Sequence, residues 1–245
     1  MKVKVVKNYE EMSREAAFFI EREVRNNPES KLGLATGGTP LGTYRHLVEG
    51  YRERQVDYSG VTTFNLDEYV NLPREHEQSY HSFMEKHLFS HVPFRATYLP
   101  NGEAEDLEEE CAAYEKLMET EGPIDVQLLG IGENGHIGFN EPGASFRSDT
   151  HIEKLTETTR EANARFFSSM EEVPERAITM GISSILKSGK ILLLASGPQK
   201  ADAIEHLLSG DIDETFPASA LYHHADVTLI VDEDAYRKGV DERGG

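Results

Sequence analysis

The chain has 245 residues, of which 38% are hydrophobic and 28% are charged, a composition typical of a folded protein rather than a disordered one. Its 44 acidic residues against 25 lysines and arginines give a formal net charge of -19, which argues against nucleic acid or an anionic membrane as a partner. A single cysteine excludes an intrachain disulfide, and the densest apolar run, residues 191–195, is too short to span a bilayer, so we expect a soluble cytoplasmic protein.

Short apolar runs alternate with helical patterns through the first half of the chain. Tyr9, Met12, Ala16 and Ile20 recur at helical spacing after a first apolar run. The acidic stretch 103–121 also carries apolar residues three to four apart, which favours a helix with a solvated face over a disordered tail. We expect strands at 3–6, 32–36, 61–66 and 95–99, and helices from Tyr9 to about Val24, at 41–51, at 78–89 and at 103–121.

The same alternation continues to the end of the chain. It predicts strands at 124–129, 177–181, 191–195 and 227–231, with helices near 183–187 and 199–208. This order predicts an α/β fold, with a mostly parallel sheet covered by helices on both faces, and one domain over residues 1–245. The polar segment 142–174 interrupts the pattern with a loop and then a helix near 160–169. It is either a cover over a site or a plain surface excursion.

A glycine turn follows the second predicted strand. In open parallel sheets, ligands bind beyond the carboxyl ends of the strands. Gly37 and Gly38 let the backbone turn closely, Thr39 can cap a helix and Pro40 suits its first turn. Such a helix start can hold a phosphate on its backbone N–H groups, but it can equally be a turn without a ligand.

The third predicted strand ends on two acidic residues. Side chains alternate along a strand, so Asp67 and Glu68 face different directions. One can point into a cleft as a general base while the other is structural. A solvated loop pair is the alternative.

A glycine-rich loop follows the strand at 124–129. Five glycines between 130 and 143 surround His136 and Glu141, which indicates a shaped loop. A histidine held by a carboxylate is a common arrangement for moving protons near neutral pH; a turn with a surface histidine is the alternative. Lys200, after the strand at 191–195, reaches the same edge. Together these residues predict cofactor-free acid–base chemistry on a small phosphorylated metabolite.

Five separated stretches, 35–40, 64–69, 132–143, 159–167 and 199–201, closely resemble the glucosamine-6-phosphate deaminase family. The resemblance runs from the first strand to about Asp232. It implies a modified Rossmann-like sheet and the conversion of glucosamine 6-phosphate and water into fructose 6-phosphate and ammonia, with no metal and no cofactor.

The resemblance also implies catalytic roles. Asp67 would take the proton from C2 of the opened amino sugar and return it at C1. His136 would move the proton that opens the pyranose ring, with Glu141 orienting it. Asn134 stands where many members carry Asp, so the loop keeps a hydrogen-bonding side chain but has one negative charge fewer. We therefore expect a less elevated pKa for His136 than the Asp form would have.

The phosphate-binding residues implied by the resemblance come from three segments. The sugar phosphate would sit on the glycine turn after the second predicted strand, with Arg165 and Lys200 closing over it. Because Arg165 falls within segment 142–174, the resemblance implies that this segment is the lid. The residues of the turn are Thr36, Gly37, Gly38 and Thr39.

Two other functions remain open from the sequence. A 6-phosphogluconolactonase shares the fold and a similar loop, and a sugar-phosphate sensor could use the same domain without catalysis.

His151 and Glu153 replace the basic residues of the allosterically activated members, so we expect a non-allosteric enzyme. The sequence leaves open whether the chain is a homo-oligomer.

Overall fold

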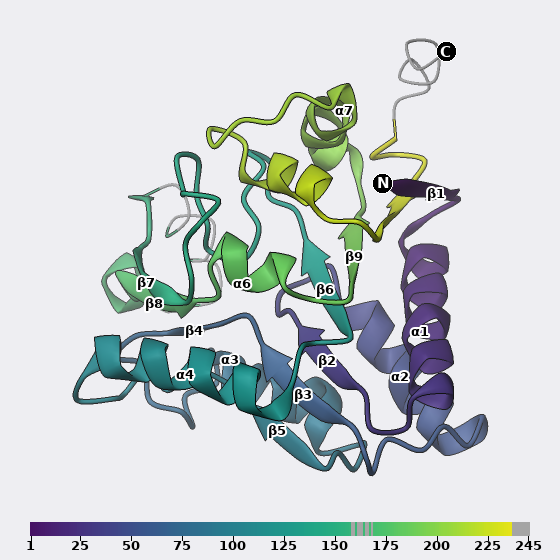
Figure 1. The fold of residues 1–245 in the computed structure, drawn as a ribbon, viewed down its shortest axis with the longest axis horizontal. Helices are drawn as coiled ribbons and strands as arrows, with labels where there is room; N and C mark the ends of the chain where they lie inside the picture. The colour runs from purple at the N-terminus through teal and green to yellow at the C-terminus, as the bar shows by residue number, and fades with distance from the viewer. Residues whose placement is uncertain (158–159, 161–163, 165–166, 168, 237–245) are drawn as a thin grey trace.

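The computed structural model describes residues 1–157, 160, 164, 167 and 169–236. Within them, seven parallel strands form the main sheet in the order β1-β10-β9-β6-β2-β3-β5 (Figure 1). The strands are short apolar runs, as predicted. They are β1 (Lys2–Val6), β2 (Lys31–Leu34), β3 (Thr62–Asn65), β5 (Ala96–Tyr98), β6 (Val126–Gly130), β9 (Lys190–Ala195) and β10 (Val227–Asp232).

Helices cover both faces of this sheet (Figure 1). Side chains alternate along each strand: on β9, Leu192 and Leu194 pack on one layer, whereas Ile191 and Leu193 pack on the other. The first layer holds α1 (Tyr9–Asn26), α2 (Leu41–Glu53), α3 (Tyr80–Met84) and the π-helix η1 (Glu85–Phe89). The second holds α4 (Leu107–Glu121), α6 (Ile182–Leu186), α7 (Ala201–Ser209) and the 3-10 helix η4 (Pro217–His223). The predicted α/β fold class is confirmed.

A second, antiparallel sheet corrects one part of the prediction. It consists of β4 (Asp67–Tyr69), β8 (Arg176–Thr179) and β7 (His151–Lys154), in the order β4-β8-β7. The strand predicted at 177–181 therefore exists, but it lies outside the parallel sheet. The sequence pattern did not reveal β4 or β7, because both are short and polar and become strands by pairing with the buried β8.

Some helix boundaries also differ from the prediction. The helix expected from residue 103 begins at Leu107, because the Asp106 side chain caps it by accepting the N–H of Glu109 at 3.0 Å. The helix expected at 78–89 is divided into α3 and η1. In the polar segment 142–174, β7 and the short helix η2 (Met170–Glu172) were not expected. Much of the helix predicted near 160–169 lies outside the described residues.

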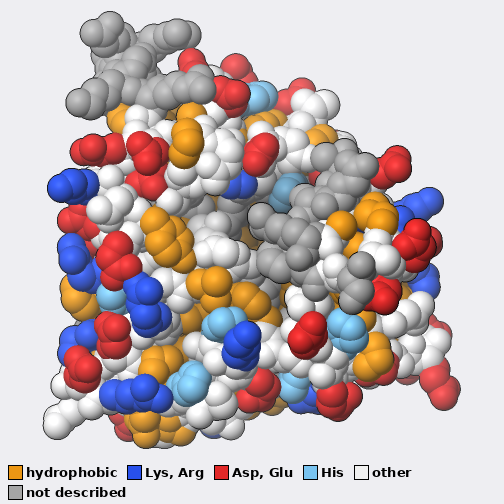
Figure 2. Space-filling view, turned by 180° about the vertical axis from the view of Figure 1, so that it is seen from behind, with side chains coloured by type: hydrophobic (Ala, Val, Ile, Leu, Met, Phe, Trp, Pro, Cys, Tyr) orange, Lys and Arg blue, Asp and Glu red, His pale blue; other side chains and the backbone are white. Residues whose placement is uncertain are grey.

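The surface reflects the acidic composition. Figure 2 shows acidic side chains spread over the face in view rather than gathered in one patch, with lysines, arginines and histidines among them. Among the helices of the described residues, none combines the length and the apolar character that a membrane span requires.

Candidate active site

All the strands of the main sheet are parallel and end at one edge, and the loops after β2, β3, β6 and β9 carry predicted residues. Strands β2, β3, β6, β9 and β10 run in one direction, so their carboxyl ends lie side by side. Crevices at such an edge are the usual ligand sites of open α/β sheets. The contacts between these loops show how far the predicted residues converge.

The loop after β6 folds back on itself through its glycines. The N–H of Gly132 donates to the carbonyl of His136 at 2.9 Å, and the N–H of Gly135 donates to Gly132 at 3.0 Å. A Cβ atom at position 132 would lie 2.2 Å from the His136 ring. Gly135 has φ of +84°, in the region that favours glycine. The glycines therefore let the imidazole lie directly on its own loop.

Asn134 joins His136 to Glu141. The Asn134 side-chain N–H donates to Glu141 Oε2 at 2.9 Å, and Asn134 Oδ1 lies 2.7 Å from His136 Nδ1. Because a carboxylate can only accept, the Asn134 nitrogen must face Glu141 and its oxygen must face His136. His136 Nδ1 therefore carries a proton, which leaves Nε2 as the free acceptor. Glu141 itself is 3.9 Å from His136 Nδ1, so it makes no direct hydrogen bond to the imidazole and acts on it through its charge.

Burial is the main influence on the His136 imidazole, and it lowers the pKa of His136 below its ordinary value. The Glu141 carboxylate works against this, and the Lys200 ammonium adds to it. We expected a less elevated pKa than the Asp form would have, and that comparison stays a prediction. In this chain desolvation outweighs the Glu141 carboxylate. A neutral imidazole at pH 7 can accept a proton.

Replacing Asn134 by Asp tests this account of His136. The carboxylate introduced beside Nδ1 should raise the His136 pKa by about one to three units, as close opposite charges do. The shift can be measured by NMR titration of the imidazole C–H signals. Asn134→Ser, which adds no charge, is the control. An unchanged His136 pKa in Asn134→Asp would contradict the hydrogen-bonded arrangement.

Asp67 lies against the histidine loop from the second sheet. It begins β4, pairs in register with Thr179 and is 6% exposed. A Cβ atom at Gly138 would lie 2.9 Å from Thr179 Oγ1 and 3.6 Å from Asp67 Oδ2. Thr179 Oγ1 also accepts the N–H of Phe139 at 3.1 Å. The predicted base therefore lies close to the predicted histidine loop, and its register partner Thr179 is hydrogen-bonded to that loop.

The two neighbouring carboxylates have different environments. Burial, with the charge of Glu68, raises the pKa of Asp67 to about 8. Glu68 instead accepts three backbone N–H groups, from Tyr69, Tyr80 and His81, at 2.8–3.0 Å, and so fastens the start of α3 to β4. The alternation predicted for these residues places one carboxyl in the site and makes the other structural.

The raised pKa of Asp67 has a consequence for stability. Between about pH 4 and pH 8 the folded protein holds a proton on Asp67 that the unfolded chain has released. Stability should therefore fall as pH rises through this window, by up to about 1.4 kcal/mol per unit from this group. Asp67→Asn removes the effect, so its melting temperature should exceed that of the wild type more at pH 9 than at pH 5. Equal differences at both pH values would contradict the raised pKa.

The turn after β2 has open space beside its two glycines. Gly37 has φ of +93°, and no atom lies within 4 Å of a Cβ built at Gly37 or Gly38. Tyr9 braces the turn, donating from its hydroxyl to the Gly38 carbonyl and accepting the N–H of Gly42, both at 2.8 Å. The predicted cap was wrong: Pro40, not Thr39, occupies the N-cap of α2.

This turn lies close to two other loops. A Cβ at Gly130, where β6 ends, would lie 3.7 Å from Thr39 Oγ1. Tyr80, which the sequence analysis did not single out, interacts through its hydroxyl with Thr36, and its ring is parallel to that of Phe139 at 6.1 Å. No sequence signal marked Tyr80, because its role depends on two distant loops.

Lys200 ends the short helix η3 (Pro198–Lys200). Burial lowers the pKa of Lys200, and its charge in turn lowers the pKa of His136, which places the ammonium near the imidazole. Lys200, His136 and Asp67 therefore belong to one region. Arg165, also predicted to bind phosphate, lies outside the described residues.

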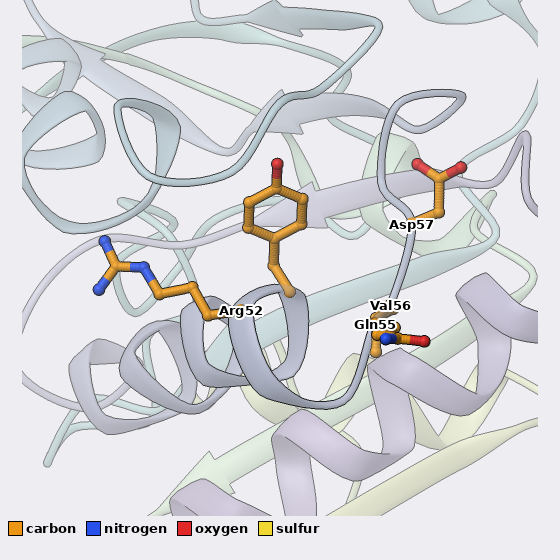
Figure 3. Close-up of a pocket in the computed structure, with 5 residues that line it drawn as sticks. Arg52, Gln55, Val56 and Asp57 are labelled. Atoms are coloured by element: carbon orange, nitrogen blue, oxygen red, sulfur yellow. The ribbon is translucent and has the colours of Figure 1, made fainter.

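A metal site and a separate cavity were two further possibilities for a functional site. No group of three or more histidine, cysteine or acidic side chains in the described ranges could hold a metal ion. A hollow of about 400 Å³ lies at the end of α2, where Arg52, Gln55, Val56 and Asp57 line it (Figure 3). Since α2 leads into the start of β3, this hollow is at the opposite edge of the sheet and contains none of the predicted residues.

Comparisons with known proteins agree with the geometry. Residues 7–230 match the family model described as glucosamine-6-phosphate isomerases/6-phosphogluconolactonase. The chain is 53% identical to a glucosamine-6-phosphate deaminase of Thermoanaerobacter pseudethanolicus over 96% of this chain and 94% of the relative. It is 52% identical to that of Halalkalibacterium halodurans over 97% and 98%.

Solved structures give the same result. A monomeric glucosamine-6-phosphate deaminase superimposes with a TM-score of 0.94 at 50% identity, covering 96% of this chain and 98% of the other. A 6-phosphogluconolactonase from Shewanella baltica superimposes with a TM-score of 0.74 at 19% identity, over 95% and 97%, and shares the fold alone.

Proposed function

The chain belongs to the family of glucosamine-6-phosphate isomerases and 6-phosphogluconolactonases, and from this we propose that it is a glucosamine-6-phosphate deaminase. It converts glucosamine 6-phosphate and water into fructose 6-phosphate and ammonia. The observation that carries the proposal is that the buried Asp67 carboxyl lies close to Gly138 of the His136 loop. This closeness brings a base and a proton carrier to one site, and moving protons on adjacent sugar atoms requires both.

Ring opening is the first proposed step. The pyranose opens when the proton of the C1 hydroxyl leaves and a proton reaches the ring oxygen. His136 can do both through Nε2, since Nδ1 is occupied by Asn134 and burial keeps the ring neutral. Glu141, which is 7% exposed, steadies the charge that the imidazole carries between the two transfers.

Proton transfer between C2 and C1 is the second proposed step. Asp67, as the carboxylate, takes the proton from C2 of the open amino sugar, and the ammonium group of the sugar gives a proton to O1, which leaves an enolamine. Returning the first proton at C1 gives the protonated imine of fructose 6-phosphate, and water then replaces nitrogen to release ammonia. A carboxyl with a raised pKa suits both halves of this step, because it is a stronger base than an ordinary Asp and holds the proton until C1 takes it.

The substrate phosphate is proposed to bind at the open turn of Thr36, Gly37, Gly38 and Thr39, with Lys200 beside it and Arg165 from the proposed lid, 142–174. Lys200→Ala should mainly raise KM, by roughly 10–100-fold, because one charge-assisted hydrogen bond is worth about 1.5–3 kcal/mol. Steady-state kinetics would show it, with Lys187→Ala as the control, a lysine of the α6 end that meets Asp149. An unchanged KM would remove Lys200 from the phosphate site.

A direct assay tests the proposed function. Purified protein is mixed with glucosamine 6-phosphate without any added cofactor, and free ammonia and fructose 6-phosphate are measured. We expect both products in equal amounts. Hydrolysis of 6-phosphogluconolactone with no ammonia would favour the lactonase, and tight sugar-phosphate binding with no turnover would favour a sensor.

A further inference from the structure

Asp232 is a buried carboxylate that the proposed reaction does not use. It ends β10, at the same edge as the candidate site, and is 3% exposed. Carboxylates are seldom so buried unless their charge is satisfied by partners. The partners of Asp232 therefore indicate what its burial achieves.

All the groups that hold Asp232 are neutral donors. The Ser196 hydroxyl donates to Oδ2, and the N–H of Gly197 donates to Oδ1 at 3.0 Å and to Oδ2 at 3.1 Å. The N–H of Ala235 donates to Oδ1 at 2.9 Å. Two of these three donor residues belong to the turn after β9, so the carboxylate ties the end of β10 to that turn.

The same turn leads to Lys200. Gly197 has φ of +90°, a conformation that favours glycine, and its carbonyl accepts the N–H of Lys200 at 3.0 Å. Gly197 is therefore held by Asp232 through its N–H and holds Lys200 through its carbonyl. Two successive hydrogen bonds connect the buried carboxylate to the backbone of the lysine.

We propose that Asp232 is a positioning residue for the substrate phosphate, because it holds the 196–200 turn in the conformation that presents Lys200 to the site. The inference rests on the proposed phosphate-binding role of Lys200. A carboxylate suits the position because both of its oxygens accept, which the three donors require. Asparagine has a single acceptor oxygen, so one buried donor of the turn would face an NH₂ group and lose its bond.

A double-mutant cycle tests this proposal. Asp232→Asn, Lys200→Ala and the double variant are compared by steady-state kinetics and by calorimetric titration with inorganic phosphate. Asp232→Asn should raise KM and the phosphate dissociation constant about tenfold, with kcat changed by less than about threefold. An effect of this size is expected when two residues, here Asp232 and Lys200, are energetically coupled. In the Lys200→Ala background Asp232→Asn should have no further effect. Asp226→Asn is the control, an aspartate directly before the same strand, whose carboxylate meets Lys2 at the surface.

The following results would separate a positioning role of Asp232 from a purely structural one. Unchanged phosphate affinity in Asp232→Asn, or an equal loss with and without Lys200, would overturn the positioning role and leave a structural one. If Asp232→Asn does not fold, Ser196→Ala, which deletes one donor, should weaken phosphate binding only when Lys200 is present. Lys200-dependent phosphate binding by a protein that releases no ammonia would refute the proposed function and leave the positioning role standing.

Discussion

Asp67→Asn should lower kcat by about 10³-fold or more, because an amide cannot take the proton from C2; loss of an acid–base group usually costs 10²–10⁴-fold. The remaining contacts change little, since Asn has nearly the same shape. In the wild type, kcat/KM should rise with pH as the Asp67 carboxyl ionises near pH 8. Initial rates of ammonia release across pH 6 to 9 would measure both effects.

Substitution of the adjacent Glu68 should affect stability, whereas substitution of Asp67 should affect turnover. Glu68 holds three backbone N–H groups, so Glu68→Gln should lower the melting temperature. Asp67→Asn should raise the melting temperature at alkaline pH while removing activity, so its loss of turnover cannot be ascribed to unfolding. Full turnover by Asp67→Asn would end the deaminase assignment, because lactone hydrolysis requires no carbon base.

His136→Gln should lower kcat by roughly 10²–10⁴-fold, because glutamine can form hydrogen bonds but cannot carry a proton between the C1 hydroxyl and the ring oxygen. KM should change far less, since the phosphate contacts lie on other loops. The effect should also be smaller with a substrate analogue that cannot form a ring, because ring opening is then unnecessary. Steady-state kinetics with both substrates would separate the two steps.

A surface histidine serves as the matched control for this variant. His91 lies after η1 and contacts Lys86 and Arg52, away from the strand ends that carry the site. His91→Gln should keep kcat within about twofold, as surface substitutions usually have small effects. If His136→Gln and His91→Gln behaved alike, His136 would have no part in proton transfer.

The motifs could be predicted from the sequence because each one is local. The glycines around His136 and after the second strand mark tight turns, because few other residues adopt the backbone conformations that these turns require. Such a turn depends only on residues next to one another in the sequence, so it can be recognised there. The alternating apolar runs likewise predicted the parallel sheet, since burial on both faces requires a continuous apolar run. Strand β4 was missed because Asp67 and Glu68 are paired into a sheet by the distant strand β8.

The sequence by itself determined the fold class and most of the order of the elements, because these depend on periodicity and on neighbouring residues, and its motifs marked the candidate site residues. Only the tertiary structure decided their electrostatics. Asn134 stands between His136 and Glu141, and burial raises the pKa of Asp67 and lowers that of His136. Such shifts depend on how much water and which charges remain around a group, and distant segments supply both only after the chain has folded.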